Sequence, residues 1–176
     1  MRPPTWIEEG RLLAGRHPAG VDPARAPAEV DELLARGVTL FLDLTEDGEL
    51  GSYVHLVAPA RHLRIPIRDF TVPAEETLVR ALDAIDAELA AGGIVYVHCW
   101  AGCGRTGVVA GCWLVRHGTA PANALDRIAK TRGLGARRRS SSGSRSRPGP
   151  RIADASRRSA SLGRVSERRA ARSDRP

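Results

Sequence analysis

One short segment of this chain places a thiol, an arginine and several glycines in a spacing that suits chemistry on an anion. Residues 98–107 are HCWAGCGRTG, in which Cys99 precedes Arg105 by six positions. An apolar run rich in β-branched residues, 94–97, comes before the segment and predicts a buried strand. A longer apolar run, 108–115, follows the segment and predicts a helix. The cysteine is therefore expected to open a glycine-containing loop between a strand and a helix.

Such a loop is suited to hold a phosphate group against a thiolate. Backbone N–H groups in a tight strand-to-helix loop can point inward, and the helix N-terminus adds the positive end of its dipole. Gly102, Gly104 and Gly107 permit backbone angles and close approaches that larger residues resist. Arg105 can offer its planar fork to two phosphate oxygens. These positive surroundings favour the thiolate form of Cys99, which could then attack phosphorus and carry the phosphoryl group.

The same residues resemble the active-site loop of the cysteine-dependent protein tyrosine phosphatase superfamily, in its branch of small dual-specificity phosphatases. The likeness covers the histidine before the cysteine, the first glycine, the arginine and the Thr-Gly that follows. It implies that Cys99 is the nucleophile, that His98 orients and activates it, and that Thr106 donates a hydrogen bond to the sulfur. The residues predicted to bind phosphate are Trp100, Ala101, Gly102, Cys103, Gly104 and Arg105. The alternatives are a structural turn with a buried cysteine and a rhodanese-like sulfur-transferase loop, which the Arg-Thr-Gly ending fits less well.

This mechanism needs a general acid, and the resemblance implies one on a loop some thirty residues before the cysteine. Segment 61–73, RHLRIPIRDFTVP, supplies Asp69 at that distance, after a short strand predicted at 63–67. The alternative is that Asp69 caps a turn before the next helix. Asp43, at the end of an apolar run, is the second candidate, and for it we favour a supporting role close to the phosphate loop.

Several residues in and after the loop have two interpretations. His98 could be a buried, hydrogen-bonded histidine, but we favour its role beside Cys99. Cys103 is either a small residue at the rim, which we favour, or a redox partner that traps oxidised Cys99 as a disulfide. Cys112 lies in the apolar helix and is predicted to be an inert core residue. Trp100 is expected to project beside the pocket, where it would pack against a substrate ring or the acid loop.

Apolar periodicity predicts alternating strands and helices along the first three quarters of the chain. Strands are expected at 11–15, 38–44, 63–67 and 94–97, and helices at 28–36, 75–91, 107–117 and 121–131. Strands separated by helices predict an α/β fold with a mostly parallel central sheet flanked by helices, phosphatase-like by the resemblance. The loop would then lie at the carboxyl end of a central strand, where such sheets bind ligands.

Composition adds limits on location and cofactors. The three cysteines lie between positions 99 and 112, so no disulfide framework is expected and reducing conditions are implied. The first residues contain no apolar signal segment, and no apolar run approaches the roughly 18 residues of a membrane span. No cysteine–histidine spacing resembles a zinc site. We therefore expect a cytoplasmic protein with no membrane span, no metal and no cofactor.

The net charge of +7 is unevenly distributed. Residues 1–131 carry 13 basic and 17 acidic side chains, whereas residues 132–176 carry 14 arginines and three acidic residues. This shift predicts a catalytic domain at 1–131 and an Arg/Ser-rich disordered tail at 132–176. The tail has no aromatic residue for base stacking, so it predicts no specific nucleic-acid partner. We favour a solvated tail without function over a polycationic arm.

A further hypothesis concerns the origin of the tail. The whole chain has one lysine and 26 arginines and is rich in Ala, Gly and Pro, which fits a GC-rich coding sequence. Relatives in this family generally continue after the segment at 121–131 with another helix, and the sequence here shows none. A frameshift that replaced the natural ending by out-of-frame sequence would explain both observations.

Taken together, the residues predict a phosphatase that hydrolyses phosphate monoesters through a cysteinyl-phosphate intermediate. The expected partner is a phosphorylated protein, with phosphotyrosine favoured and phosphoserine or phosphothreonine behind it, or a small phosphomonoester. Phosphoinositides and small phosphorylated metabolites are alternative substrates; relatives that prefer inositol lipids often carry lysines in this loop, where Trp100 and Cys103 stand here. The rival hypothesis is a silent phosphate-binding pseudophosphatase or a truncated inactive product. The presence together of Asp69, Cys99 and Arg105 argues against a silent site.

Overall fold

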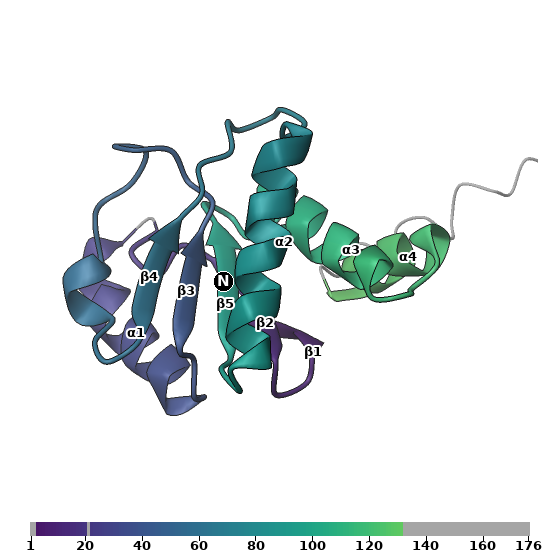
Figure 1. Ribbon diagram of the computed structural model, residues 1–176. Helices are drawn as coiled ribbons and strands as arrows, with labels where there is room; N and C mark the ends of the chain where they lie inside the picture. Colours follow the sequence, from purple (N-terminus) through teal and green to yellow (C-terminus); the bar gives the residue numbers. More distant parts are fainter. Residues whose placement is uncertain (1–2, 21, 132–176) are drawn as a thin grey trace, which may run out of the picture. The chain divides into compact units, whose positions relative to one another are not determined.

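The computed structural model describes residues 3–20 and 22–131, and the predicted tail at 132–176 lies outside them. The strands are β1 (Thr5–Glu8), β2 (Leu12–Arg16), β3 (Leu40–Asp43), β4 (Arg61–Arg64) and β5 (Val95–Cys99). The helices are α1 (Ala26–Ala35), α2 (Glu75–Ala90), α3 (Gly104–Arg116) and α4 (Pro121–Thr131), with short 3₁₀ turns η1 (Pro23–Arg25) and η2 (Val54–Leu56). From β3 onwards, α2 separates β4 from β5, whereas β3 and β4 are joined through η2 and α4 follows α3 directly (Figure 1).

The five strands form one sheet in the order β1-β2-β5-β3-β4. Strands β2, β5, β3 and β4 run parallel, and only β1 runs antiparallel to its neighbour within this sheet. The central strand β5 is buried along its whole length, as its run of apolar residues predicts for a strand covered on both faces. The mostly parallel α/β sheet expected from the sequence is thus confirmed.

Helices cover both faces of the sheet, and each face has its own apolar core. Helix α1 contributes Val30 and Leu33 to one core, whereas α2, α3 and α4 contribute to the other. Alternation along the strands divides the residues between the two cores, because successive side chains point to opposite faces. In β5, Val95 and Val97 belong to the core beneath α2 and α3, while Tyr96 belongs to the core beneath α1.

Most predicted elements are present with shifted ends. Helix α2 is present and begins at the predicted residue, Glu75. Its pattern was readable because Leu82, Ile85 and Leu89 recur at helical spacing and are buried. The strand predicted at 63–67 lies instead at Arg61–Arg64, ending before Pro66, which cannot donate to a strand ladder. Strand β1 was not predicted, because its four residues bury only Ile7 and show little alternation. None of the described helices is long and apolar enough to cross a membrane.

Parallel pairing brings the carboxyl ends of the strands to one edge of the sheet. The pairing register sets Arg16 of β2 opposite Cys99 of β5, and Asp43 of β3 opposite His98. Residues that are far apart in the sequence therefore meet where the glycine-containing loop begins. This edge carries the residues on which the functional predictions rest.

Candidate active site

The loop predicted to bind phosphate joins β5 directly to α3. Cys99 is the last residue of β5 and is 3% exposed, and α3 begins five positions later at Gly104. Gly102 has a φ of +70°, a backbone conformation that a residue with a Cβ seldom adopts. The expected strand, loop and helix are therefore present, with the thiol at the bottom of the turn.

The backbone of this loop offers unpaired donors. The N–H groups of residues 100–103 donate no hydrogen bond to any group in the described part of the chain. Cys103, the N-cap residue of α3, makes no capping hydrogen bond through its side chain. Free N–H groups at a helix N-terminus, together with the helix dipole, form a site for an anion.

Arg105 lies buried in the first turn of α3, and a carboxylate holds its fork. Nη1 and Nη2 of Arg105 donate to Glu49 at 2.7 and 2.6 Å, and Nη1 also donates to the carbonyl of Ile67 at 3.1 Å. These hydrogen bonds raise the pKa of Arg105 and lower that of Glu49, so both groups stay charged. Nε of Arg105 forms no hydrogen bond within the described residues and lies 3.3 Å from Asp69 Oδ1.

Asp69 lies on the loop after β4, as the sequence predicted, and its carboxylate faces Arg105. Its side chain is 39% exposed, and its Oδ1 accepts the N–H of Phe70 at 3.0 Å. Phe70 has a φ of +56° and is fully exposed, so the turn presents the carboxylate beside an uncovered ring. The helix that follows has Ala74 as its N-cap residue, so Asp69 does not cap α2.

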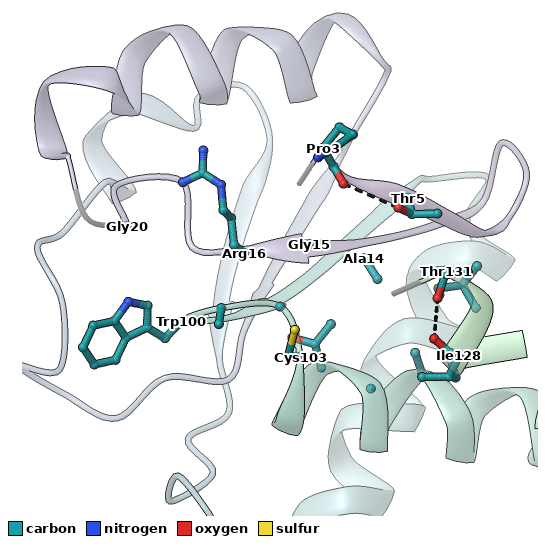
Figure 2. A pocket seen from close by; sticks show the side chains of 16 residues that line it. Pro3, Thr5, Ala14, Gly15, Arg16, Gly20, Trp100, Cys103, Ile128 and Thr131 are labelled. Carbon is teal, nitrogen blue, oxygen red and sulfur yellow. Dashed lines mark hydrogen bonds between the residues drawn. The ribbon is translucent and has the colours of Figure 1, made fainter. Parts of the chain in front are cut away.

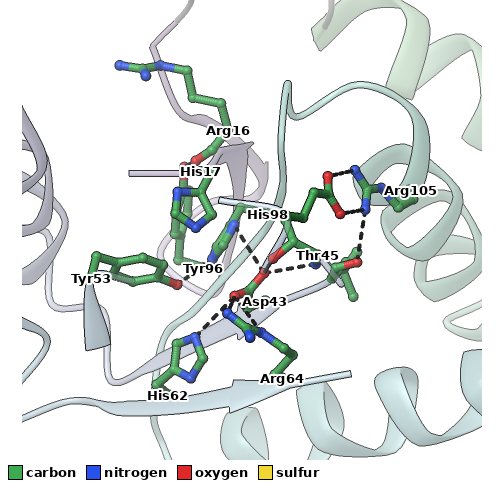
Figure 3. Close-up of polar contacts among 12 residues, drawn as sticks. Arg16, His17, Asp43, Thr45, Tyr53, His62, Arg64, Tyr96, His98 and Arg105 are labelled. Atoms are coloured by element: carbon green, nitrogen blue, oxygen red, sulfur yellow. Dashed lines mark hydrogen bonds and ion pairs between the residues drawn. The ribbon is translucent and has the colours of Figure 1, made fainter. Parts of the chain in front are cut away.

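Asp43 is completely buried at the end of β3, and both of its carboxylate oxygens accept hydrogen bonds (Figure 3). Oδ1 accepts the N–H and the hydroxyl of Thr45 at 2.9 and 2.7 Å. Oδ2 accepts hydrogen bonds from Nε and Nη2 of Arg64 at 3.1 and 3.0 Å and lies 3.3 Å from Nε2 of His62. Burial by itself would raise the pKa of Asp43, but the hydrogen bonds from His62 and Thr45 outweigh it and hold the pKa below its usual value. Asp43 is therefore ionised.

His98 is buried between Asp43 and a tyrosine. Its Nε2 lies 2.5 Å from the hydroxyl of Tyr53, and its Nδ1 lies 3.9 Å from Oδ1 of Asp43. Burial lowers the pKa of His98 to about 3 and raises that of Tyr53, so both groups are neutral near pH 7. The phenol then donates to Nε2, which leaves the imidazole proton on Nδ1, facing Asp43.

Thr106 and Cys103 follow the nucleophile candidate in the loop and helix. Thr106 is buried, and its hydroxyl has no hydrogen-bond partner within the described residues, so the predicted bond to the sulfur of Cys99 is not formed. Cys103 is exposed at the rim, and all three cysteines are free thiols. Cys112 is half-buried against the core, and burial raises its pKa.

The other loop residues differ in exposure. Trp100 is 45% exposed, so it projects from the loop as expected. Ala101 and Gly104 are exposed, and Gly102 is half-buried. A cavity of about 280 Å³ lies against these loop residues on the side of β1, β2 and α4 (Figure 2). Cys99, Asp69 and Arg105 do not line this cavity, so it borders the phosphate loop on a side that these three residues do not reach.

Two residues of the site were missed by the sequence reasoning. Glu49 was missed because it lies in a polar turn with no periodicity. A signal was available: a buried arginine needs a counter-charge, and this turn is the acidic segment nearest in the sequence to Asp43. Tyr53 lies in a loop before η2, and nothing local marks it as a partner of His98. Within the described residues, no group of three or more His, Cys, Asp or Glu side chains could hold a metal ion.

Fold and loop together match the cysteine-dependent protein tyrosine phosphatase superfamily. Residues 1–158 match the family described as "PTP-SAK: Swiss Army Knife protein, DSP-PTPase phosphatase domain", and the chain belongs to this family. The family lies in the small dual-specificity branch of the superfamily that the loop resembles.

Known relatives fall in the same class. The chain is 32% identical over 90 residues to protein 067L of Invertebrate iridescent virus 3, which carries the name of a tyrosine phosphatase, with 49% of this chain and 38% of that protein covered. It is 33% identical over 94 residues to the phosphatidylglycerophosphate phosphatase PTPMT1 of Arabidopsis thaliana, covering 52% of this chain and 28% of that protein. The matches thus span less than half the length of these relatives. The crystal structure of Tk-PTP in the active form superposes with a TM-score of 0.64 at 29% identity, covering 78% of this chain and 99% of that one.

Proposed function

We propose that the protein hydrolyses phosphate monoesters through a cysteinyl-phosphate intermediate on Cys99. The observation that carries this proposal is the convergence of a buried thiol, unpaired loop N–H groups and the Arg105 guanidinium at the N-terminus of α3. The phosphate dianion would bind the N–H groups of residues 100–105 together with Nε of Arg105, which has no hydrogen-bond partner among the described residues.

The reaction would proceed in two displacement steps. The Cys99 thiolate attacks phosphorus, the bond to the leaving oxygen breaks, and protonated Asp69 gives that oxygen its proton. The ionised Asp69 then takes a proton from a water molecule, which attacks phosphorus and releases inorganic phosphate and the Cys99 thiolate. Asp69 suits both steps, because its half-exposed carboxylate lies 3.3 Å from the arginine that would hold the phosphate.

Three buried residues would support the nucleophile. Neutral His98 would orient Cys99 from the preceding position, with its ring fixed by Tyr53. Thr106 would rotate its free hydroxyl to the sulfur when the thiolate departs. Asp43 would hold this end of the sheet through its hydrogen bonds, rather than exchange protons with the substrate.

The substrate class that we favour is phosphotyrosine in proteins, with phosphoserine or phosphothreonine as further substrates. The exposed rings of Trp100 and Phe70 offer flat apolar surface next to the loop and to Asp69, which suits an aromatic leaving group. A phospholipid or phosphoinositide is the second candidate, because one relative is named a phosphatidylglycerophosphate phosphatase. Parallel assays with a phosphotyrosyl peptide and with a phospholipid separate these two candidates.

Hydrolysis of a small aryl phosphate by freshly reduced full-length protein tests the proposal. Cys99→Ser should abolish turnover, because serine is a far weaker nucleophile in this site. Cys112→Ser is the matched control, since it removes a half-buried thiol on α3 and should keep turnover. Folded wild-type protein that binds phosphate without turnover would instead identify a pseudophosphatase.

We further propose that residues 1–131 form the catalytic domain and that the tail is dispensable. A chain ending at Thr131 should fold and keep turnover, because all the site residues named above lie before that position. The family match extends to residue 158, so a chain ending there is the natural comparison. Activity in the longer chain and loss in the shorter one would move the domain boundary beyond Thr131.

A further inference from the structure

The end of strand β2 continues beyond the sheet and contacts the phosphate loop. Arg16 pairs with Cys99 in the parallel ladder, and the next residue, His17, donates its backbone N–H to the carbonyl of Trp100 at 3.0 Å. The hydroxyl of Tyr96 donates to the carbonyl of Arg16 at 2.6 Å and so holds the last residue of β2 in place. The ladder therefore extends one residue into the loop that follows Cys99.

The loop lies directly on this backbone. A Cβ added to Gly102 would approach the carbonyl carbon and oxygen of Gly15 to 2.5 Å, closer than real Cβ atoms come to backbone. A Cβ on Gly15 would in turn meet the hydroxyl of Tyr96 at 2.3 Å. Glycine at both positions allows two backbone segments, 87 residues apart in sequence, to touch.

The side chain of His17 contacts the other flank of the nucleophile candidate. Its ring is 1% exposed and lies edge-on to the ring of His98, with 5.2 Å between the ring centroids (Figure 3). It also lies edge-on to Tyr53 at 4.9 Å, the residue whose hydroxyl bonds His98. His17 thus contacts the residue before Cys99 through its ring and the residue after Cys99 through its backbone.

The protonation state of His17 suits packing rather than charge. Nδ1 accepts the N–H of Ala19 at 3.1 Å, so the proton of the neutral ring is on Nε2. Burial lowers the pKa of His17 to about 4, against the attraction of Asp43, which raises it. The ring is therefore uncharged near pH 7 and adds no positive charge beside the phosphate loop.

We propose that His17 is a positioning residue that fixes the main chain on both sides of Cys99, before it through the contact of its ring with His98 and after it through its backbone hydrogen bond to Trp100. The proposal rests on the proposed function of Cys99 as a nucleophile. It goes beyond that function because it assigns part of the active-site geometry to the N-terminal strand pair, a region that supplies no reacting group. A loosened ring contact should let Cys99 and the N–H groups after it lose their common orientation.

Three variants of the full-length protein separate the parts of this contact. His17→Asn keeps an oxygen that can accept the N–H of Ala19, but it removes the ring. His17→Phe keeps a ring against His98 and removes the acceptor. Phe41→Leu is the matched control, because Phe41 packs on Tyr53 and Tyr96 in the same aromatic cluster but makes no ring contact with His98. Should His17→Asn not fold, His17→Leu, which fills similar space without a flat ring, replaces it.

Two readouts on folded protein report positioning rather than stability. We expect His17→Asn to lower kcat for an aryl phosphate by about 10-fold or more, since small misplacements of reacting groups are costly. We also expect it to shift the pH midpoint of Cys99 alkylation by iodoacetamide, with the modified cysteine located by peptide fragmentation. His17→Phe and Phe41→Leu should stay close to wild type in both readouts.

Two outcomes would overturn the proposal. One is that His17→Asn matches Phe41→Leu in kcat and in alkylation, which would leave His17 with a purely structural role. The other is that His17→Phe loses as much as His17→Asn, which would assign the effect to the acceptor and not to the ring. The alkylation readout needs only the thiol, so a wild-type protein without turnover would refute the proposed function while this comparison still decides the role of His17.

Discussion

Asp43 ends strand β3 and Asp69 lies in the loop after the neighbouring parallel strand β4, yet the surroundings of the two carboxylates are opposite. Asp43 is fully buried and takes five hydrogen bonds, from Thr45, His62 and Arg64. Asp69 is 39% exposed; within residues 3–20 and 22–131 it accepts one hydrogen bond, from the N–H of Phe70, and lies 3.3 Å from Nε of Arg105. The oxygens of Asp43 are occupied by donors of the fold, whereas Asp69 has fewer donors among the described residues and is open to solvent.

Under the proposed function, this difference would let one residue type take two roles at one edge of the sheet. A general acid must gain and lose a proton in each cycle, and a carboxylate whose oxygens are all occupied by donors cannot do so easily. We therefore base the role proposed for each aspartate on its hydrogen-bond partners rather than on its position at the end of a strand or in the loop after it. The following changes test this contrast.

The largest expected effect is the loss of stability when Asp43 becomes Asn. The substitution replaces a buried carboxylate that accepts five hydrogen bonds by a neutral amide and removes one of the two carboxylate partners of Arg64, so the free energy of unfolding should fall by about 3 kcal/mol. Urea denaturation monitored by circular dichroism measures it. Asp86→Asn is the control, because Asp86 is a half-buried acceptor for Trp113 and His117 away from the loop, and it should lose only about 1 kcal/mol. An equal loss of unfolding free energy in Asp43→Asn and Asp86→Asn would show that the five hydrogen bonds of Asp43 carry no special weight in the fold.

Asp69→Asn should have the reverse profile. The free energy of unfolding should change by less than about 0.5 kcal/mol, because the residue is half-exposed and makes few contacts. Its kcat should fall by about 100-fold, because the leaving oxygen loses its proton donor. Asp47→Asn removes a charge from the exposed turn nearby and should leave kcat unchanged. A kcat for Asp69→Asn within a few-fold of wild type would assign the acid role to another group.

Acidification should weaken the fold through the buried histidines. The pKa values of His98 and His17 are lowered by burial to about 3 and about 4, from 6.5 in an unfolded chain. Below pH 6.5 the unfolded chain therefore binds protons that the folded protein excludes, so stability is greatest above pH 6.5 and falls as the pH decreases toward 4. Between pH 6.5 and 5.5 we expect a loss of about 1 kcal/mol for each histidine. Unfolding free energies that stay constant over this range would mean that these rings are accessible to protons.

The candidate site was predictable where its chemistry is contiguous in the sequence. Cys99, Arg105 and the loop between them occupy one short segment, and the apolar runs on either side fix the strand and the helix that position them. Asp69 was found because the resemblance supplied a spacing, and the structure brings its carboxylate to Arg105. Helix α2 was found because its apolar residues recur at helical spacing over four turns.

Partners that meet only through the tertiary fold were missed. Glu49 reaches Arg105 across 56 positions, Tyr53 reaches His98 across 45, and His17 reaches His98 across 81. No local pattern marks such pairs, because strand order and register decide which chain segments become neighbours. Strand β1 was missed for a related reason, since its pairing with β2, rather than its own pattern, makes it a strand.

The smallest expected effect concerns Glu49 and decides whether this carboxylate orients Arg105 or competes with the substrate for it. Like Asp43, Glu49 has its oxygens occupied by donors: it accepts hydrogen bonds from both Nη atoms of Arg105, which would leave Nε for the phosphate. Glu49→Gln should therefore lower kcat/KM by about 10-fold, or about 1.4 kcal/mol, because the fork loses its charged anchor. Glu46→Gln is the control, since it removes a charge from the same turn, and no hydrogen bond or ion pair links its side chain to Arg105 among the described residues. If Glu49→Gln instead raised kcat/KM and tightened inhibition by inorganic phosphate, Glu49 would compete with the substrate for Arg105 rather than orient it.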